Sequence, residues 1–333
     1  MEKKESSMKS ITLKSLVLLA VLTVFAAAPA WSAVTLKAGH VLAPVHPYHV
    51  GMEKFAELVD AKTGGEVKVE VFHSAQLGNE RELVEALQMG TTDVCLISTA
   101  PMAGFSKDFL VYDLPYLFTS PAQAYEILDG PIGQASMEGI KKADLIGLAF
   151  WENGFRNITN SKLEIKTPED LKGLKIRTME NKIHMATFRA LGADPTPIAS
   201  GEVFTALQQK TVDGQENPLT GIYTSKYYEV QKYLSLTEHF YSPAPLLIGL
   251  EAWNKLTPEQ QKAVQEAADE AKIFQRELNQ KEVAQAQKEL EAKGMTVTTV
   301  DKAVWKEAMA PIYKEFEKEV GVDRLNAILE ATK

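Results

Sequence analysis

The sequence predicts an α/β fold built as two lobes, in which strands alternate with helices. After the first 33 residues, the chain begins with strand-like and helix-like segments in the order β-α-β-α-β. Residues 258–293 then indicate one long helix, because they are rich in Ala, Glu, Gln and Lys and contain no Gly, and no Pro after Pro258. About 300 residues remain after the first segment, which is enough for two lobes with buried cores.

Three segments near the start of this region are expected to be strands. Residues 34–38 place apolar side chains at every second position, and residues 67–72 alternate valine with charged residues. Residues 94–97 are continuously apolar, as in a strand that is covered on both faces. With helices between them, these strands predict a mainly parallel sheet with helices on both sides.

The helices are predicted from apolar spacing and from their start signals. Met52, Phe55 and Val59 lie at helical spacing. Asn79, followed three residues later by Glu82, is typical of a helix start. Residues 167–170 and 257–260 each combine a capping hydroxyl with proline at the first helical position. For residues 258–293, two helices with a kink are the alternative.

Residues 1–33 have the order of a secretory signal peptide. Four lysines precede a short apolar run at 16–25, and small residues with a proline follow at 26–30. We expect cleavage near residues 30–33 and export of the mature chain. The alternative is a membrane anchor, for which the apolar run is short.

Charge and cysteine content exclude several classes of protein. The formal net charge is −8, and it argues against a nucleic acid partner because phosphate binding needs a basic surface. Cys95 is the single cysteine, so the chain has no intramolecular disulfide.

Arg177 is the strongest candidate for a ligand contact. Residues 174–177 alternate apolar and basic side chains, which predicts a short strand with Arg177 at its carboxyl end. Ligands bind at that edge of open parallel sheets, and a guanidinium matches a carboxylate with two parallel hydrogen bonds. The alternative is a surface or structural ion pair.

Two further segments offer polar groups beside predicted strands. Residues 212–218 read as a short strand running into a polar turn, in which Asn217 supplies a donor and an acceptor. Residues 151–157 follow the buried strand expected at 145–151, and there Arg156 beside Phe155 offers an anion contact with an apolar wall. An ordinary turn and a packed chain crossing are the respective alternatives.

Ser98, Thr99 and His184 complete the predicted set of ligand contacts. The two hydroxyl residues follow the strand at 94–97, where they would bind a ligand oxygen or cap a helix. His184 lies in the helix expected after Arg177, as a packed residue or a neutral ligand contact.

Motifs for catalysis, metals and cofactors are missing from the sequence. There is no Gly-rich phosphate loop, dinucleotide motif or nucleophile elbow. His46 and His49 are three residues apart, but no zinc helix motif or cysteine pair supports a metal site. We expect no cofactor, no metal and no enzymatic activity.

Several blocks resemble the DctP family, the substrate-binding proteins of tripartite ATP-independent periplasmic (TRAP) transporters. They are residues 191–197 (Leu-Gly-Ala-Asp-Pro-Thr-Pro), 202–209, 212–218 (Val-Asp-Gly-Gln-Glu-Asn-Pro), 167–177, and 74–78 followed by 80–83. The likeness covers nearly the whole mature chain. It departs from the family at residues 180–185 and at Ser200, which stands where several members have an aromatic residue.

This resemblance implies a two-lobed periplasmic binding protein fold of type II-like form, with a hinge and a long spanning C-terminal helix. We expect lobe I to comprise residues 34–153 plus 243–280, and lobe II residues 154–242 plus 281–333. Arg177 matches the family's main carboxylate-binding arginine, and Arg156 and Asn217 match further ligand contacts.

The resemblance also implies a function in the periplasm. We expect a monomer that binds a small organic acid and delivers it to a membrane permease of one small and one large subunit, driven by an ion gradient. A periplasmic enzyme acting on a small organic acid and a ligand-presenting sensor protein are the alternatives. The sequence leaves open whether the ligand is a dicarboxylate, a 2-oxo acid, a sugar acid, an amino acid or a sulfonate.

Overall fold

The computed structural model describes residues 33–332. The predicted signal peptide, apart from Ala33, lies outside the described residues. Within residues 33–332, no helix combines the length and the apolar character that crossing a membrane requires.

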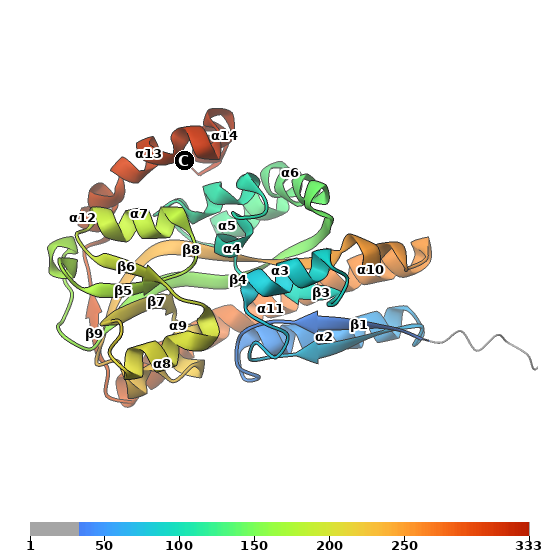
Figure 1. Cartoon of the computed structure of the whole chain (residues 1–333), viewed down its shortest axis with the longest axis horizontal. Helices are drawn as coiled ribbons and strands as arrows, with labels where there is room; N and C mark the ends of the chain where they lie inside the picture. Colours follow the sequence, from blue (N-terminus) through green and yellow to red (C-terminus); the bar gives the residue numbers. More distant parts are fainter. Residues whose placement is uncertain (1–32, 333) are drawn as a thin grey trace, which may run out of the picture. The chain divides into compact units, whose positions relative to one another are not determined.

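A single sheet of nine strands runs through the described part of the chain (Figure 1). The order is β2-β1-β3-β8-β4-β7-β5-β6, and β9 pairs with β8 beside this path. The strands are β1 (Val34–Gly39), β2 (Val67–Phe72), β3 (Val94–Leu96), β4 (Leu145–Asn160), β5 (Lys175–Thr178), β6 (Asp194–Pro197), β7 (Gly214–Pro218), β8 (Tyr233–Gly249) and β9 (Thr296–Thr299).

The two long strands β4 and β8 form the centre of the sheet. They are antiparallel, and β8 also pairs antiparallel with β3, while β4 pairs antiparallel with β7. The pairs β1–β3, β5–β6, β5–β7 and β8–β9 are parallel. The sheet is therefore mixed, and the prediction of a mainly parallel sheet is wrong at its centre, because an apolar run does not reveal strand direction.

The β4–β8 ladder is irregular near its middle. The register shifts between Glu152 and Gly154 and again between Arg156 and Ile158. Gly154 has a φ of 115°, a backbone conformation that favours glycine. These irregularities bend and twist the strand and turn the side chains of Arg156 and its neighbours in directions that a regular ladder would not give.

The helices connect the strands and cover the sheet. They are α2 (Pro47–Lys62), α3 (Glu80–Gln88), α4 (Thr99–Met102), α5 (Pro121–Asp129), α6 (Pro131–Gly139), α7 (Lys182–Ala190), α8 (Val203–Gln208), α9 (Leu219–Thr224), α10 (Leu250–Asn254), α11 (Pro258–Ala292), α12 (Lys302–Met309), α13 (Pro311–Val320) and α14 (Val322–Ala331). Short 3-10 segments lie at Lys107–Asp113, Ile140–Ala143, Pro168–Leu171, Ser200–Glu202 and Tyr227–Glu229.

The long helix α11 is continuous over 35 residues, as one of the two predicted alternatives requires. Its start is fixed by a capping box, in which the Thr257 hydroxyl accepts from the backbone N–H of Gln260 and the Gln260 side chain accepts from the Thr257 N–H. The helix packs on α2, β4 and α9, and Figure 1 shows it passing along the sheet beside α2.

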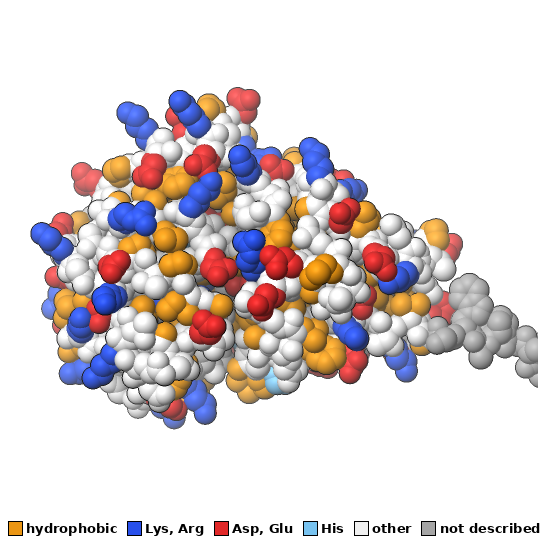
Figure 2. Space-filling model, viewed as in Figure 1, with side chains coloured by type: hydrophobic (Ala, Val, Ile, Leu, Met, Phe, Trp, Pro, Cys, Tyr) orange, Lys and Arg blue, Asp and Glu red, His pale blue; other side chains and the backbone are white. Residues whose placement is uncertain are grey.

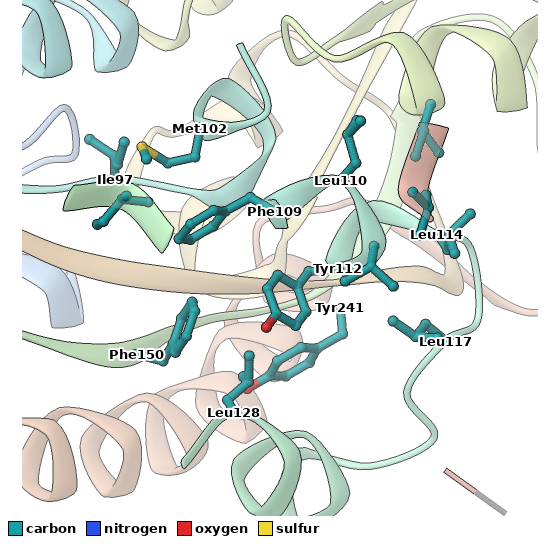
Figure 3. Packing of buried hydrophobic residues seen from close by; sticks show 14 of the residues in the cluster. Ile97, Met102, Phe109, Leu110, Tyr112, Leu114, Leu117, Leu128, Phe150 and Tyr241 are labelled. Atoms are coloured by element: carbon teal, nitrogen blue, oxygen red, sulfur yellow. The ribbon is translucent and has the colours of Figure 1, made fainter. Parts of the chain in front are cut away.

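The largest core cluster contains three aromatic rings that pack together, one from β4 and two from the 3-10 segment before α5. Phe109 and Tyr112 lie with their ring centroids 5.9 Å and 5.6 Å from that of Phe150 (Figure 3). Such edge and tilted ring pairs add about 0.5–1.5 kcal/mol each to the apolar burial. A second cluster packs Ile176 of β5 against Phe240 and Trp305. Ile176 directly precedes Arg177, so this packing holds the strand that carries Arg177 in place.

Charged side chains of both signs are interspersed on the face shown in Figure 2. The figure shows no extended basic surface on that face. The prediction that nucleic acid is not a partner stays a prediction.

Three local predictions need correction. Residues 151–157 do not follow a strand but belong to β4, which continues to Asn160. Asn217 lies within strand β7 rather than in a turn, because residues 214–218 pair with β4. The helix start predicted at residues 167–170 is a single 3-10 segment, although its capping box is present.

Candidate functional site

Arg177 is a buried cation at the carboxyl-terminal part of β5. Arg177 is 2% exposed, and its Nε donates to the backbone carbonyl of Ile198 at 2.7 Å. Within residues 33–332, its two terminal nitrogens have no hydrogen-bond or ion-pair partner. Burial lowers the pKa of Arg177, but a guanidinium stays charged at ordinary pH. The two terminal nitrogens of the guanidinium are therefore available to an anion.

Arg156, by contrast, already has an anionic partner. From β4 it reaches Glu216 of β7, with Nε to Oε2 at 2.5 Å and Nη2 to Oε1 at 2.8 Å. Nη2 also donates to the Glu216 carbonyl at 2.7 Å and to Asn217 Oδ1 at 3.2 Å. Its Nη1 is buried and has no hydrogen-bond partner among residues 33–332. Glu216 thus holds the guanidinium in place and leaves one donor nitrogen unused.

Asn217 extends this polar group along β7. Its side-chain amide donates from Nδ2 to Gln215 Oε1 at 2.5 Å while its oxygen accepts from Arg156. These two contacts fix the orientation of the amide.

Glu80 and Ser98 contribute polar atoms from the other side of the site. The backbone N–H of Ser98 donates to Glu80 Oε1 at 2.7 Å, and Asn153 Nδ2 donates to Ser98 Oγ at 3.2 Å. Burial raises the pKa of Glu80, while the bonds from Ser98 and the charges of Arg177 and Arg156 oppose that shift. A carboxylate therefore lies close to both arginines.

These side chains line two adjoining chambers, which share Glu80, Arg177, Met179 and Ser200. The Arg156 chamber is completed by Val41, Leu42, Ser98, Asn153, Arg156 and Asn217. The Arg81 chamber is completed by Asn79, Arg81, Pro101, Glu180, Ile198 and Ala199.

Each chamber has a volume of about 10 Å³, which is room for about one water molecule. The arrangement is closed, so a small organic acid requires the walls to separate before it enters.

The structure brings four of the seven predicted site residues to these chambers: Arg177, Arg156, Asn217 and Ser98. Thr99 and His184 lie together elsewhere, around Asp113. The Thr99 hydroxyl donates to Asp113 Oδ1 at 3.2 Å, and His184 Nε2 lies 3.4 Å from the same oxygen. For Thr99 and His184, a ligand contact stays a prediction that this closed arrangement does not display.

Phe155 also lies outside the chambers. Its ring packs edge-on against Tyr241, with centroids 5.1 Å apart. It lines a separate cavity of about 210 Å³ together with Tyr116, Lys302 and other residues. For Phe155 too, a ligand contact stays a prediction that this closed arrangement does not display, because neighbouring side chains of β4 point to opposite faces.

Sequence reasoning missed Glu80 and Asn153. Glu80 is the first residue of α3 and reads as an ordinary acidic helix start, since acids are favoured there by the helix dipole. Asn153 precedes Gly154 in the segment expected to follow the strand at 145–151, where a packed chain crossing is the alternative. Among residues 33–332, no group of three or more His, Cys, Asp or Glu side chains is placed to hold a metal ion.

Comparison with known proteins matches this arrangement to one family. Residues 38–319 match the model of the bacterial extracellular solute-binding protein family 7, named DctP. A solute-binding protein of Verminephrobacter eiseniae is 44% identical over 283 residues, which cover 85% of this chain and 84% of the relative.

Two solved structures show the same fold with bound carboxylates. A TRAP periplasmic solute-binding protein from a Polaromonas species, bound to D-erythronate, superposes with a TM-score of 0.87 at 42% identity, covering 89% of this chain and 98% of that one. One from Sulfurospirillum deleyianum, bound to succinate, has a TM-score of 0.85 at 33% identity, covering 90% and 99%.

These matches confirm the resemblance noted in the sequence and the two-lobed fold with its long C-terminal helix. They also confirm that the chain belongs to a class of binding proteins rather than enzymes. The chain is a member of the bacterial extracellular solute-binding protein family 7, the DctP family of TRAP transporter binding proteins.

Proposed function

We propose that this protein captures a small organic carboxylate through Arg177 and delivers it to a TRAP permease of one small and one large subunit, driven by an ion gradient. The observation that carries the proposal is a buried guanidinium whose terminal nitrogens have no partner among the described residues and face a polar cavity. A buried, unpaired cation is costly in free energy, and a carboxylate relieves that cost by pairing with it.

Capture by closure of two lobes fits the position of the chambers. The predicted boundaries at 153/154 and 242/243 fall in the irregular part of the β4–β8 ladder. Glu80, Ser98 and Asn153 belong to the predicted lobe I, while Arg156, Arg177 and Asn217 belong to the predicted lobe II. The contacts nevertheless join Thr35–Lys333 into one unit, so the boundaries remain a proposal.

The ligand favours closure by its higher affinity for the closed form. Closure excludes water and strengthens the pairing of Arg177 with the carboxylate. The closed surface is then what the permease recognises.

We place the mature protein in the periplasm. The proposal rests on the signal peptide pattern of residues 1–33 and on membership of an extracellular solute-binding family. Fractionation of cells that express the full chain tests it: the mature protein is expected in the periplasmic fraction, shortened by about 30 residues. Retention of the full-length chain in the cytoplasm contradicts the assignment.

A thermal unfolding screen of organic acids tests the binding function. An acid present at about 100 times its Kd stabilises the protein by about 2.7 kcal/mol and so raises Tm by several degrees. The amides of the same acids serve as matched controls without charge. If no carboxylate raises Tm, or if acids and amides act equally, the proposal fails.

A further inference from the structure

A buried polar network lies beside the two chambers, between α4 and the start of α7. Its side chains are those of Thr99, Asp113, Asn181 and His184, and all four residues are buried. None of the four lines either chamber. Capture of a carboxylate by Arg177 therefore makes no direct use of them, and their role has to come from the elements that they join.

The side-chain amide of Asn181 uses all of its hydrogen-bonding capacity. Its Oδ1 accepts from the backbone N–H groups of Ile183 at 2.8 Å and His184 at 3.2 Å, and so caps α7. Its Nδ2 donates to Asp113 Oδ2 at 2.9 Å and to the carbonyl of Ala100 at 3.1 Å. Because the oxygen faces only donors and the nitrogen only acceptors, the amide has one orientation, which joins α7 to α4 and to the 3-10 segment that ends at Asp113.

The carboxylate of Asp113 depends on this amide. Its other oxygen accepts from the Thr99 hydroxyl at 3.2 Å, and His184 Nε2 lies 3.4 Å from that oxygen without a hydrogen bond. Within residues 33–332, no lysine or arginine forms an ion pair with Asp113. A buried carboxylate is stable only when it is hydrogen-bonded or paired, so loss of the Asn181 amide would leave Asp113 with the Thr99 hydroxyl alone.

These bonds cross the gap that a ligand has to open. Ala100 directly precedes Pro101, and Asn181 directly follows Glu180; Pro101 and Glu180 both line the Arg81 chamber. Each chamber holds about one water molecule, so the walls must separate before a ligand enters. Separation of these walls stretches or breaks the bonds of Asn181 to Ala100 and Asp113. In the predicted division of the chain, Ala100 and Asp113 belong to lobe I and Asn181 to lobe II.

We propose that Asn181, Asp113 and the Ala100 carbonyl form a latch that closes beside the bound ligand and slows its release. Asn181 is then a positioning residue that acts on affinity without touching the ligand. Bonds that exist only in the closed form shift the balance towards that form and so lower the ligand's dissociation rate. This inference rests on the proposed function, since a latch affects binding only if the chain captures a ligand by closure.

Asn181→Asp tests the latch. Aspartate caps a helix as well as asparagine does, so α7 keeps its cap. The new carboxylate faces the Asp113 carboxylate and the Ala100 carbonyl, which removes both latch bonds and adds like-charge repulsion. We expect the Kd at pH 7.5 to rise at least about tenfold, mainly through faster dissociation.

The affinity is measured by titration calorimetry and the rate constants by stopped-flow tryptophan fluorescence. The ligand is whichever acid of the thermal screen raises Tm most, with succinate, pyruvate and gluconate in the screen as a dicarboxylate, a 2-oxo acid and a sugar acid. Thermal unfolding without ligand checks that each variant is folded.

A second substitution distinguishes the latch from damage to the fold. Adding Asp113→Asn to Asn181→Asp puts the amide on residue 113 and the carboxylate on residue 181, so the pair forms again in the reverse direction, although the Ala100 carbonyl stays without a donor. We expect at least about threefold of the affinity to return. Asn326→Asp, the same change at an exposed position of α14, is the control and should leave the Kd unchanged.

The outcomes separate the latch from the proposed function. The latch is wrong, while carboxylate capture stands, if Asn181→Asp binds within about twofold of the wild type or loses affinity only through slower association. It is also wrong if the second substitution returns no affinity. If no acid in the screen binds the wild-type protein, the proposed function fails and the latch fails with it.

Discussion

Arg156 and Glu216 form a two-point ion pair across β4 and β7 in which both side chains are buried. The carboxylate and the guanidinium are 60 residues apart in the sequence. The charge of Arg156 pulls the pKa of Glu216 well below its ordinary value against the opposing effect of burial, which is the largest single influence on that group. The pair therefore fixes one wall of the chambers before a ligand arrives.

Glu216→Gln is expected to destabilise the protein by about 3–5 kcal/mol, because it leaves the Arg156 charge buried without its hydrogen-bonded anion. Urea unfolding followed by circular dichroism measures the loss. The exposed pair Lys54–Glu57 is the control, and Glu57→Gln should change stability by less than about 0.5 kcal/mol. Equal unfolding midpoints for the two variants would show that the buried pair contributes no more stability than the exposed pair.

The pH dependence of stability is expected to reflect His46, which caps α2. Its Nδ1 accepts from the Tyr48 N–H at 3.1 Å, and burial lowers its pKa to about 3. The unfolded state takes up the proton near pH 6.5 and the folded state does not, so stability falls as the pH drops from about 6.5 towards 3.

His46→Asn keeps a capping acceptor and removes the titrating ring. Between pH 7 and pH 5 we expect the wild type to lose about 2 kcal/mol more than this variant. His40, whose pKa burial also lowers to about 3 with smaller contributions from His49, His46 and His73, remains in both proteins, so the main part of its effect cancels in the comparison. Parallel stability curves for wild type and variant would contradict the role of His46.

Gly214 is required where β7 meets β4. A Cβ at this position would lie 2.3 Å from the carbonyl oxygen of Thr159 and 2.9 Å from the Asn160 Cβ. We expect Gly214→Ala to cost about 1–3 kcal/mol or more, because the ladder beside Arg177 must move. Gly201→Ala, whose Cβ would meet only Ala75 at 3.9 Å, is the matched control. Urea midpoints that agree for the two variants would refute this packing argument.

Glu152 connects the irregular part of β4 to α11. Its buried carboxylate accepts from Tyr125, Tyr241, Asn279 and Gln280. Glu152→Gln places an NH₂ group opposite at least one of these donors, and we expect a loss of about 1–3 kcal/mol. Thermal unfolding measures it, and a variant as stable as the wild type would mean that water or rearranged partners satisfy the donors.

Local signals in the sequence predicted much of the fold. The alternation in β2, the capping boxes at Asn79 and Thr257, and the uninterrupted composition of α11 are each decided by residues close in the chain, and the structure confirms them. Arg177 was also predicted at its place in β5, because the strand pattern and the following helix start at Asn181 are local.

The remaining features depend on partners distant in sequence. The segment around Gly154 was expected to lie beyond the strand at 145–151, yet pairing with β8 keeps it within β4. Asn217 lies in a strand for the same reason, since β7 is held by β4 and β5. The neutralisation of Arg156 by Glu216 and the approach of Glu80 to both arginines arise only when separate elements meet, so no local pattern reveals them.

Titration calorimetry with the organic acid that raises Tm most in the thermal screen decides whether Arg177 binds the ligand carboxylate. Arg177→Ala is expected to weaken binding by about 2–5 kcal/mol, and Arg177→Lys also by a large factor, because a single ammonium cannot reproduce the planar fork. Arg189→Ala, a truncation of an exposed arginine on α7, should leave the affinity unchanged. Wild-type affinity in either Arg177 variant would contradict the account.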